Sequence, residues 1–381
     1  MSSFNIPEEI VIDILLRLPS KSLVRFTCVC KSWQDLIRSS SFARSHLNRN
    51  TARRSHRYLY AYHRSTTDHE PAKHYQHSLF SVETFEPCLN LRHPLWTGKQ
   101  FRIYGSCNGL LCISDKNLRS NSPICIWNPS IQKFRVLPNI GTPLRLKSTY
   151  RLIWNPIRKS CIRKSHARLS FGFDPQLNDY MVVRIVESEL SNLVEVVEVY
   201  TLSTNSWKRI RVTPPWSNSI YIHMGSAFLN GIEYWTAKTC SGYKIAAFDT
   251  RSKQFQELMV PKEDSIWLLL VRVCQESLCF FHYYEGSIDL WMMKEQCLNK
   301  VGKAHLPEKG GYPVPLISSS MDNELVIMHQ YRDEHGLEFD QMAIFNIESR
   351  QSIRTGIRLE RKDFGYFDGG SYIESLVLLS D

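Results

Sequence analysis

The sequence lacks the features that mark secreted and membrane proteins. No apolar run in its 381 residues approaches the roughly 18–20 residues that a membrane-spanning helix needs. The first nine residues have neither the basic start nor the apolar stretch of a secretory signal. The eleven cysteines form no Cys-x-x-Cys pair, and several, such as Cys112 and Cys279, lie within apolar runs. We therefore expect a cytoplasmic or nuclear protein, without a membrane partner, whose thiols are reduced and buried.

Catalytic and metal-binding motifs are missing as well. The sequence contains no phosphate-binding loop, no His-Glu-x-x-His pair and no calcium loop. Cys107 lies in a Gly-x-Cys-x-Gly segment like that of a nucleophile elbow, but the apolar run after it predicts a strand where an elbow needs a helix. A polar segment carries four histidines whose spacing fits no defined metal site: His63, His69, His74 and His77. We expect no catalytic residue, no cofactor and no metal.

The positive charge of the chain is unevenly distributed. Lysine and arginine number 47 against 37 aspartate and glutamate residues, which gives a net charge of +10. Much of the excess falls between Ile140 and Leu169, where no acidic residue occurs and the basic residues are Arg145, Lys147, Arg151, Arg158, Lys159, Arg163, Lys164 and Arg168. A solvated loop explains such a stretch, and a site for nucleic acid or an acidic protein is the alternative.

The first fifty residues have the pattern of amphipathic helices. Pro7-Glu8-Glu9 is typical of a helix start, because proline loses no hydrogen bond there and the carboxylates lie at the positive end of the helix dipole. Apolar residues then recur every fourth position up to Leu18-Pro19, where the proline ends the helix. A second helix is expected from Ser20 through Ile37. A module this small cannot bury all its apolar surface, so that surface packs on the rest of the chain or on a partner.

These residues closely resemble the F-box motif, over about residues 5–47. Ile6–Ile10, Leu18-Pro19 and Cys28–Trp33 keep the order and spacing of the motif, and Ile6 stands where leucine is more usual, which preserves apolar volume. The resemblance implies docking on the Skp-type adaptor of a cullin–RING ubiquitin ligase. Carried over residue by residue, the adaptor-binding set, at or just behind that interface, is Ile6, Pro7, Ile10, Leu15, Leu18, Pro19, Leu23, Val29 and Trp33.

From residue 75 onward the sequence repeats a β pattern, with short alternating runs separated by Asn, Asp, Gly and Pro. One aromatic residue marks each of six copies, at intervals of about 43–54 residues and one of about 73; the markers are Phe80, Trp127, Tyr200, Phe248, Trp291 and Phe345. This period predicts a β-propeller of six blades, with seven blades or a β-sandwich as alternatives. If about 25 residues within 140–169 are left out, the interval of about 73 residues becomes similar to the others. Ser371–Leu378 is expected as a last strand that closes the ring with early strands.

This part of the chain resembles the plant F-box-associated domain, which has a kelch-like propeller character. The resemblance is carried by Gly105–Cys112, Trp127–Ser130, Phe171–Pro175, Asn205–Trp207, Asn230-Gly231 and Trp291–Glu295. Two departures are evident: Gln296–Asn299 replaces a Ser-Trp-Thr-like strand, and an extra segment follows Pro138. Within that segment Ile153–Pro156 repeats the pattern of Ile126–Pro129, which fits a partial duplication, a long loop or a stretch wrongly included in the coding sequence.

The predicted fold class is α+β and multidomain. A helical F-box module spans residues 1–50, a polar linker 51–76, and an all-β, propeller-like domain 77–381 with a basic insertion at about 140–169. The resemblance implies a non-catalytic substrate-recognition subunit of a Skp–cullin–F-box ubiquitin ligase, whose β domain binds a target protein for ubiquitination. The adaptor would join it to the cullin and RING subunits, and nucleic acid is not an expected partner. The alternative is a basic scaffold that binds nucleic acid or an acidic protein without a ligase role.

Overall fold

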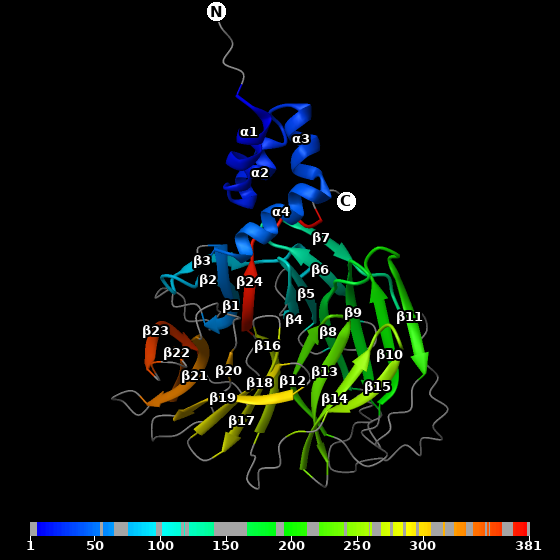
Figure 1. The fold of residues 1–381 in the computed structure, drawn as a ribbon, viewed down its shortest axis with the longest axis vertical. Coiled ribbons are helices and arrows are strands. Elements are labelled where there is room, and N and C mark those ends of the chain that lie inside the picture. Colours follow the sequence, from blue (N-terminus) through cyan, green and yellow to red (C-terminus); the bar gives the residue numbers. More distant parts are fainter. Residues whose placement is uncertain are drawn as a thin grey trace, which may run out of the picture.

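Four helices stand on one end of a ring of β-sheets (Figure 1). The helices are α1 (Glu8–Leu16), α2 (Ser20–Phe26), α3 (Lys31–Arg38) and α4 (Ser40–Thr51). The computed structural model describes residues 6–53, 56–64, 75–96, 101–115, 118, 122–140, 166–187, 194–211, 221–239, 242–258, 260, 268–274, 277–284, 287–294, 297–305, 315–316, 324–332, 338–346, 349, 351–359 and 369–378. No helix within these ranges is long and apolar enough to cross a membrane.

The helices begin and end where the local chemistry changes. α1 follows Pro7 and carries two glutamates in its first turn. The segment from Ser20 through Ile37 forms two helices, so the prediction of a single helix there is wrong. α2 ends at Phe26 because the next residue, Thr27, donates its hydroxyl to the carbonyl of Val24 at 2.7 Å, which favours a local turn over a further helical turn. The Ser39 hydroxyl caps α4 by accepting a hydrogen bond from the Phe42 amide at 3.2 Å.

The described strands form six four-stranded antiparallel sheets. In hydrogen-bonded order, sheet 1 holds β24 (Gly369–Ile373), β1 (Arg57–Arg64), β2 (Tyr75–Ser81) and β3 (Pro87–Leu91), and sheet 2 holds β4 (Phe101–Cys107), β5 (Leu110–Asp115), β6 (Ile124–Asn128) and β7 (Lys133–Val136). Sheet 3 holds β8 (His166–Asp174), β9 (Asp179–Glu187), β10 (Val194–Thr201) and β11 (Ser206–Arg211), and sheet 4 holds β12 (Tyr221–Leu229), β13 (Ile232–Thr239), β14 (Gly242–Asp249) and β15 (Gln254–Leu258). Sheet 5 holds β16 (Leu268–Cys274), β17 (Ser277–Tyr284), β18 (Ser287–Lys294) and β19 (Cys297–His305), and sheet 6 holds β20 (Pro315–Leu316), β21 (Glu324–Arg332), β22 (Glu338–Asn346) and β23 (Ser352–Leu359). A short 3₁₀ turn, η2 (Pro94–Trp96), connects β3 to β4.

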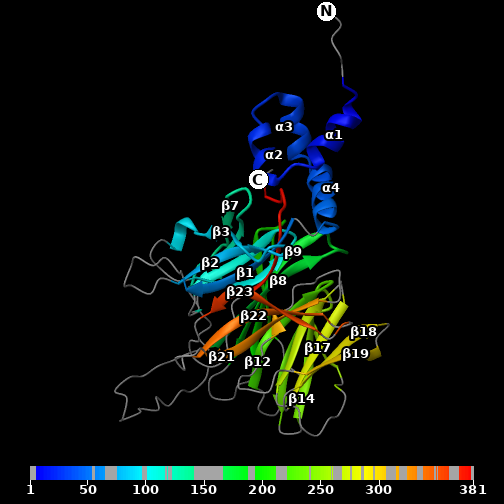
Figure 2. The ribbon, with the colours of Figure 1, turned by 90° about the vertical axis from the view of Figure 1, so that its left-hand side faces the viewer.

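The sheets follow one another around a central axis. From sheet 1 to sheet 5 the first strand of one sheet contacts the first strand of the next, in the order β24, β4, β8, β12 and β16. Sheet 6 contacts sheet 1 through β23 and β1 (Figures 1 and 2). Apolar clusters fill the spaces between neighbouring sheets; in one of them Val183 and Val199 of sheet 3 join Trp235 and Phe248 of sheet 4. Sheets that pack face to face around an axis in this way form a β-propeller.

The repeated aromatic residue marks the third strand of each sheet. The six markers fall in β2, β6, β10, β14, β18 and β22. The turn after this strand is stabilised by its last residue in three sheets: the side chains of Asn128, Asp249 and Asn346 accept hydrogen bonds from backbone amides two or three residues later. The first hairpin of two sheets turns on Asn108-Gly109 and Asn230-Gly231, whose four φ angles are positive. The sequence period is therefore a repeat of turn chemistry as well as of apolar residues.

The last strand closes the ring with an early strand, as predicted. β24 pairs with β1, with Tyr372 opposite Tyr58, but it ends at Ile373 instead of Leu378. Tyr372 is 1% exposed and its hydroxyl lies 2.6 Å from the Ser130 hydroxyl of sheet 2. The residues after Ile373 leave the sheet because they bind elsewhere: the Asn128 side-chain amide donates to the backbone carbonyls of Ser375 and Val377.

The predicted polar linker over residues 51–76 is wrong. It contains β1 and the beginning of β2. Leu59 and Ala61 pack into one buried cluster and Tyr60 into another, because β1 lies inside a sheet and both of its faces are covered. His77, one of the four histidines considered as metal ligands, stacks on Phe101 with ring centroids 4.5 Å apart, and His69 and His74 lie outside the described residues.

Most of the basic insertion predicted at about 140–169 lies outside the described residues, and so does Ile153–Pro156. The described chain continues at His166 with β8, so the predicted boundary at 169 extends four residues into a strand. Leu169 is 5% exposed and packs between sheets 2 and 3. Its burial is the reason that this end of the basic stretch belongs to the ring.

Removing the closing strand tests the ring. A chain that ends at Asp368 loses the buried Tyr372, and loss of a buried aromatic side chain alone costs about 3–5 kcal/mol. We expect the melting temperature followed by circular dichroism to fall by at least about 10 °C. A control chain that ends at Leu378 retains β24 and should melt like the full chain. Equal melting of the two shortened chains would contradict closure through β24.

A buried carboxyl between sheets 3 and 4 makes stability depend on pH. Glu233 in β13 is 2% exposed, and burial raises the pKa of its carboxyl to about 8, although the hydroxyls of Ser170 and Ser226 offset part of that rise. Between pH 4.5 and about 8 the folded chain keeps this proton while the unfolded chain has lost it, so the free energy of unfolding falls as pH rises.

The Glu233→Gln variant removes this titration. We expect its unfolding free energy, measured by urea denaturation, to exceed that of the unsubstituted chain increasingly from pH 5 to pH 8. The slope of the difference should be at most about 1.4 kcal/mol per pH unit. A difference that stays constant over this range would show that Glu233 is ionised in the folded protein.

Candidate functional site

The helical module has a small core that the ring completes. One apolar residue from each helix is buried there: Leu15 of α1, Leu23 of α2, Ile37 of α3 and Phe42 of α4. Two residues of the ring join the same cluster, Ile131 from the β6–β7 turn and Leu376 from the segment after β24. The helices therefore rest on the ring and share a core with it, which fixes one side of the module.

Polar contacts around Glu374 hold the same junction. One carboxylate oxygen of Glu374 accepts a hydrogen bond from the backbone amide of Ser20 at 3.2 Å, and the other accepts from the Tyr58 hydroxyl at 3.2 Å. The Asn50 side-chain amide donates to the Glu374 backbone carbonyl at 3.1 Å. Since Ser20 is the first residue of α2, the carboxylate lies at the positive end of that helix.

His46 connects α4 to the rest of the module. Its Nε2 atom lies 2.9 Å from the carbonyl oxygen of Leu18, and the ring stacks on Phe42. Burial lowers the pKa of His46, so the ring is neutral at physiological pH and donates from Nε2. Asp13 bridges α1 to α4 through its contact with Arg49 at 3.2 Å, and the Arg17 guanidinium beside it lowers its pKa. The helices thus form one unit.

Outside this junction the helical module exposes large apolar residues. Ile6, Ile10, Ile14 and Val29 have exposed fractions of 59%, 52%, 49% and 61%. Isolated exposed apolar residues are common on proteins, but four on a module of four short helices leave a surface suited to a partner. In Figure 1 α1 to α3 lie at the end of the molecule farthest from the ring.

The structure divides the nine predicted adaptor-binding residues into three groups. Five are exposed: Ile6, Pro7, Ile10, Pro19 and Val29. Leu18 and Trp33 are half-buried, and Trp33 packs against Phe26 with ring centroids 5.7 Å apart.

Leu15 and Leu23, the remaining two, are 1% and 0% exposed. They lie behind the surface and support it. Ile14 was absent from the predicted set although it is exposed; its signal was the four-residue spacing from Ile10.

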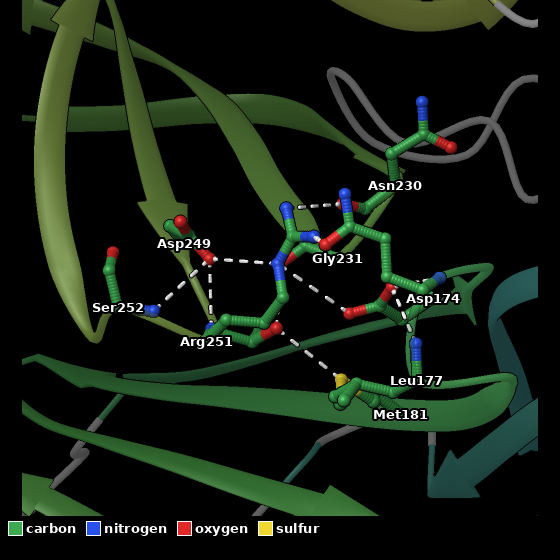
Figure 3. A network of polar contacts seen from close by, with 10 residues as sticks. Asp174, Leu177, Met181, Asn230, Gly231, Asp249, Arg251 and Ser252 are labelled. Atoms are coloured by element: carbon green, nitrogen blue, oxygen red, sulfur yellow. Dashed lines mark hydrogen bonds and ion pairs between the residues drawn. The ribbon is translucent and has the colours of Figure 1, made fainter.

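The rim of the ring has a charged network that is structural in character (Figure 3). Arg251 of sheet 4 donates to the Asn230 carbonyl at 3.2 Å, and its Nε atom lies 3.8 Å from Asp174 Oδ2 and 3.6 Å from Asp249 Oδ1. Asp174, which is fully buried, belongs to sheet 3. The position opposite it must be glycine, since a Cβ on Gly231 would lie 2.5 Å from Asp174 Oδ2. The Arg251 guanidinium thus joins sheets 3 and 4 through a carboxylate from each.

Cys107 ends β4 directly before a tight turn, and the strand predicted after this segment is present. Asn108 and Gly109 have φ of 51° and 78°, and strand β5 follows at Leu110. Burial raises the pKa of the Cys107 thiol to about 12, so the sulfur stays protonated and is a poor nucleophile. No group of three or more potential metal ligands occurs among the residues that the structure describes.

The helical part and the ring each match a known family. The family model of the F-box domain matches residues 3–45, and that of the F-box associated beta propeller domain matches residues 69–377. Among relatives in Arabidopsis thaliana, one F-box protein is 29% identical over 275 residues, which are 68% of this chain and 62% of that protein. F-box protein CPR1 is 28% identical over 323 residues, 76% of this chain and 70% of CPR1. An F-box/kelch-repeat protein is 27% identical over 307 residues, 77% of each chain. The chain thus spans less than two thirds of the first of these relatives.

Substitution by alanine should affect stability differently at core and surface positions of α1. Leu15→Ala removes a buried side chain from the module core and should destabilise the protein by about 2–5 kcal/mol. Ile14→Ala, next to it, removes a side chain that is 49% exposed and should change the unfolding free energy by no more than about 0.5 kcal/mol. Urea denaturation followed by far-UV circular dichroism would measure both. A reversed order would mean that the module packs differently.

Proposed function

Because the chain belongs to the F-box proteins that carry an F-box-associated β-propeller domain, we propose that it is the substrate-recognition subunit of a Skp–cullin–F-box ubiquitin ligase. In this role the helices bind the Skp-type adaptor and the ring binds a target protein. The observation that carries the proposal is the set of exposed apolar residues in the helical module: Ile6, Ile10, Ile14 and Val29.

The two sides of the helical module serve two different contacts. The side that holds Phe42, Leu376 and Ile131 is already buried against the ring. Outside that contact the module retains exposed apolar residues, whose burial at an interface stabilises a complex by about 1.5–3 kcal/mol for each large side chain. In this proposal Leu15 and Leu23 support the interface from the core, and the adaptor contacts Ile6, Pro7, Ile10, Ile14 and Val29 directly.

The chain itself contributes no catalytic group to ubiquitin transfer. The adaptor joins it to the cullin and RING subunits, and a charged conjugating enzyme supplies the reactive thioester. The contribution of this subunit is to raise the effective concentration of a target lysine at that thioester. A helical module that shares its core with the ring suits this task, because the target is then held at a defined distance from the adaptor. In this proposal, ubiquitin transfer to the target takes place in the cytoplasm or the nucleus.

In the same proposal the ring has six blades, one for each four-stranded sheet. The blade that contains β24 and β1 joins the C-terminal and N-terminal parts of the β domain. The β domain therefore begins at β1, near residue 57, and the helical module ends with α4 at Thr51. These boundaries replace the predicted linker.

A second candidate function rests on the basic stretch between Ile140 and Leu169. Eight basic residues without an acidic neighbour suit nucleic acid or an acidic protein. Binding to nucleic acid would weaken steeply between 50 and 200 mM salt, because phosphate contacts release counterions. Burial of apolar residues at an adaptor would not show that dependence, so a salt titration separates the two functions.

The adaptor surface is tested with substitutions that leave the module core intact. The double variant Ile10→Asp, Ile14→Asp places two carboxylates on the exposed surface. It should weaken adaptor binding at least about 100-fold, since two apolar side chains that the adaptor would bury are lost. Isothermal calorimetry of the full-length chain with the purified adaptor measures the effect. The matched control is Val301→Asp in β19, where a 44% exposed side chain lies on the ring. Equal affinities of the double variant and the control would refute the assignment.

A further inference from the structure

Eight of the ten large apolar side chains that are exposed among the described residues belong to two parts of the chain, and Leu177 and Val301 lie apart from both. One group is the helical surface assigned above to the adaptor. The second group comes from sheets 1 and 2 and consists of Leu89 of β3, Leu95 of η2, and Phe134 and Val136 of β7. Nothing in the proposed function uses this second group.

β7 differs from the other outer strands of the ring. It carries two exposed large apolar side chains, Phe134 at 39% and Val136 at 44%. The described apolar side chains of β11 and β15 are half-buried, and β3 and β19 expose one each. A single exposed apolar residue on an outer strand is ordinary, but alternate exposed positions on one strand of four residues form a small apolar face.

The backbone of β7 is arranged to accept a further strand. Among the described strands it pairs with β6 alone, so one side of it is an outer edge. The Leu137 amide donates to the Ile124 carbonyl at 2.9 Å, which makes 137, 135 and 133 the positions whose backbone groups point toward β6. The N–H and C=O groups of Phe134 and Val136 therefore point to the outer edge.

The apolar face rests on a rigid support. The Phe134 ring packs against the His93 ring at 4.6 Å, and His93 in turn packs against Trp127 at 5.1 Å. His93 Nδ1 accepts a hydrogen bond from the Leu95 amide at 3.2 Å, which holds the exposed Leu95 beside the same ring. Since burial lowers the pKa of His93 to about 4, this support is uncharged at physiological pH. Leu95 and Phe134 are thus held on one preformed surface.

The surroundings of β7 are basic. Between Pro87 and Ile140 the sequence has seven lysine and arginine residues and a single acid, Asp115, which accepts a hydrogen bond from the Trp96 indole at 2.9 Å. On β7 the basic residues Lys133 and Arg135 alternate with Phe134 and Val136 and so project from the opposite face of the strand. A strand added at this edge would meet apolar side chains on one face and positive charge on the other.

We propose that the outer edge of β7 binds an extended segment of the target protein in which acidic and apolar residues alternate, added to sheet 2 as a fifth strand. The backbone groups of Phe134 and Val136 pair with the segment, the apolar residues of the segment contact Phe134, Val136 and Leu95, and its acidic residues face Lys133. This inference rests on the proposed role as a substrate receptor. The site also lies close to the helices, since β7 starts two residues after Ile131, which packs in the module core (Figure 1).

The probe for this site is a fluorescein-labelled ten-residue peptide of alternating glutamate and valine. Its control has the same composition with the five glutamates in one block, which keeps the charge and removes the alternation. Fluorescence anisotropy with the full-length chain should show at least tenfold tighter binding of the alternating peptide. Equal affinities would mean charge attraction alone and would overturn the proposal.

Substitutions at Val136 separate the backbone from the side chain. Val136→Pro removes the outward-pointing N–H without touching the hydrogen bonds to β6, and proline is tolerated at such positions of edge strands. We expect it to weaken binding of the alternating peptide at least tenfold, whereas Val136→Ala should weaken it two- to threefold. Lys133→Glu should weaken the same peptide and strengthen a lysine–valine peptide. Unchanged binding by a folded Val136→Pro variant would overturn the proposal.

Hydrogen exchange of the unsubstituted chain gives an independent answer if the proline variant does not fold. Saturating peptide should slow exchange in the fragment that contains β7, and unaltered exchange there would exclude strand addition. Adaptor binding is measured in parallel on each variant. Val136→Pro should keep its adaptor affinity, and Ile10→Asp, Ile14→Asp should keep its peptide affinity. Failure of the edge site is thereby distinguished from failure of the ligase role.

Discussion

The pairing of β24 with β1 joins the two ends of the ring, and the chain that emerges from it also holds the helices. Tyr372 is buried within this pairing, and Glu374 and Leu376, which follow directly, enter the polar and apolar contacts of the helical module. Closure of the ring and orientation of the helices therefore depend on the same few residues. A propeller without such a closing strand would leave an open sheet edge, and a module without Leu376 would have an incomplete core.

This coupling matters for a substrate receptor because a ubiquitin ligase works by position. The helices contact the ring through a shared core and through hydrogen bonds to Glu374, which leaves little freedom between the two parts. In the proposed role, a target bound to the ring would then be presented at a fixed place relative to the adaptor. The same division explains the apolar residues of the module, since Leu15 and Leu23 serve the shared core while Ile10 and Val29 remain available for a partner.

The sheets of the ring are built alike, and the differences between them lie at the rim. Each sheet places a marker aromatic in its third strand, and asparagine or aspartate side chains stabilise several of the turns. What varies is the chemistry of the rim: a network of Arg251 with Asp174 and Asp249 in one sector, and exposed apolar side chains among basic residues in another. Recognition depends on such sectors, because the repeated core is similar from sheet to sheet.

The sequence by itself determined the presence of the helical module, the β repeat and the closing strand. Asn108-Gly109 and the Asn128 turn act over a few residues, so their geometry is encoded locally and is visible in the sequence. It did not show that β1 is a strand, because a strand covered on both faces lacks simple alternation and its tyrosines look polar. It also did not show which of Ile14 and Leu15 faces outward, since both belong to one apolar stripe. Only the packing of α1 against the other helices decided that Leu15 fills the core and Ile14 stays at the surface, because burial is a property of the neighbours and not of the residue.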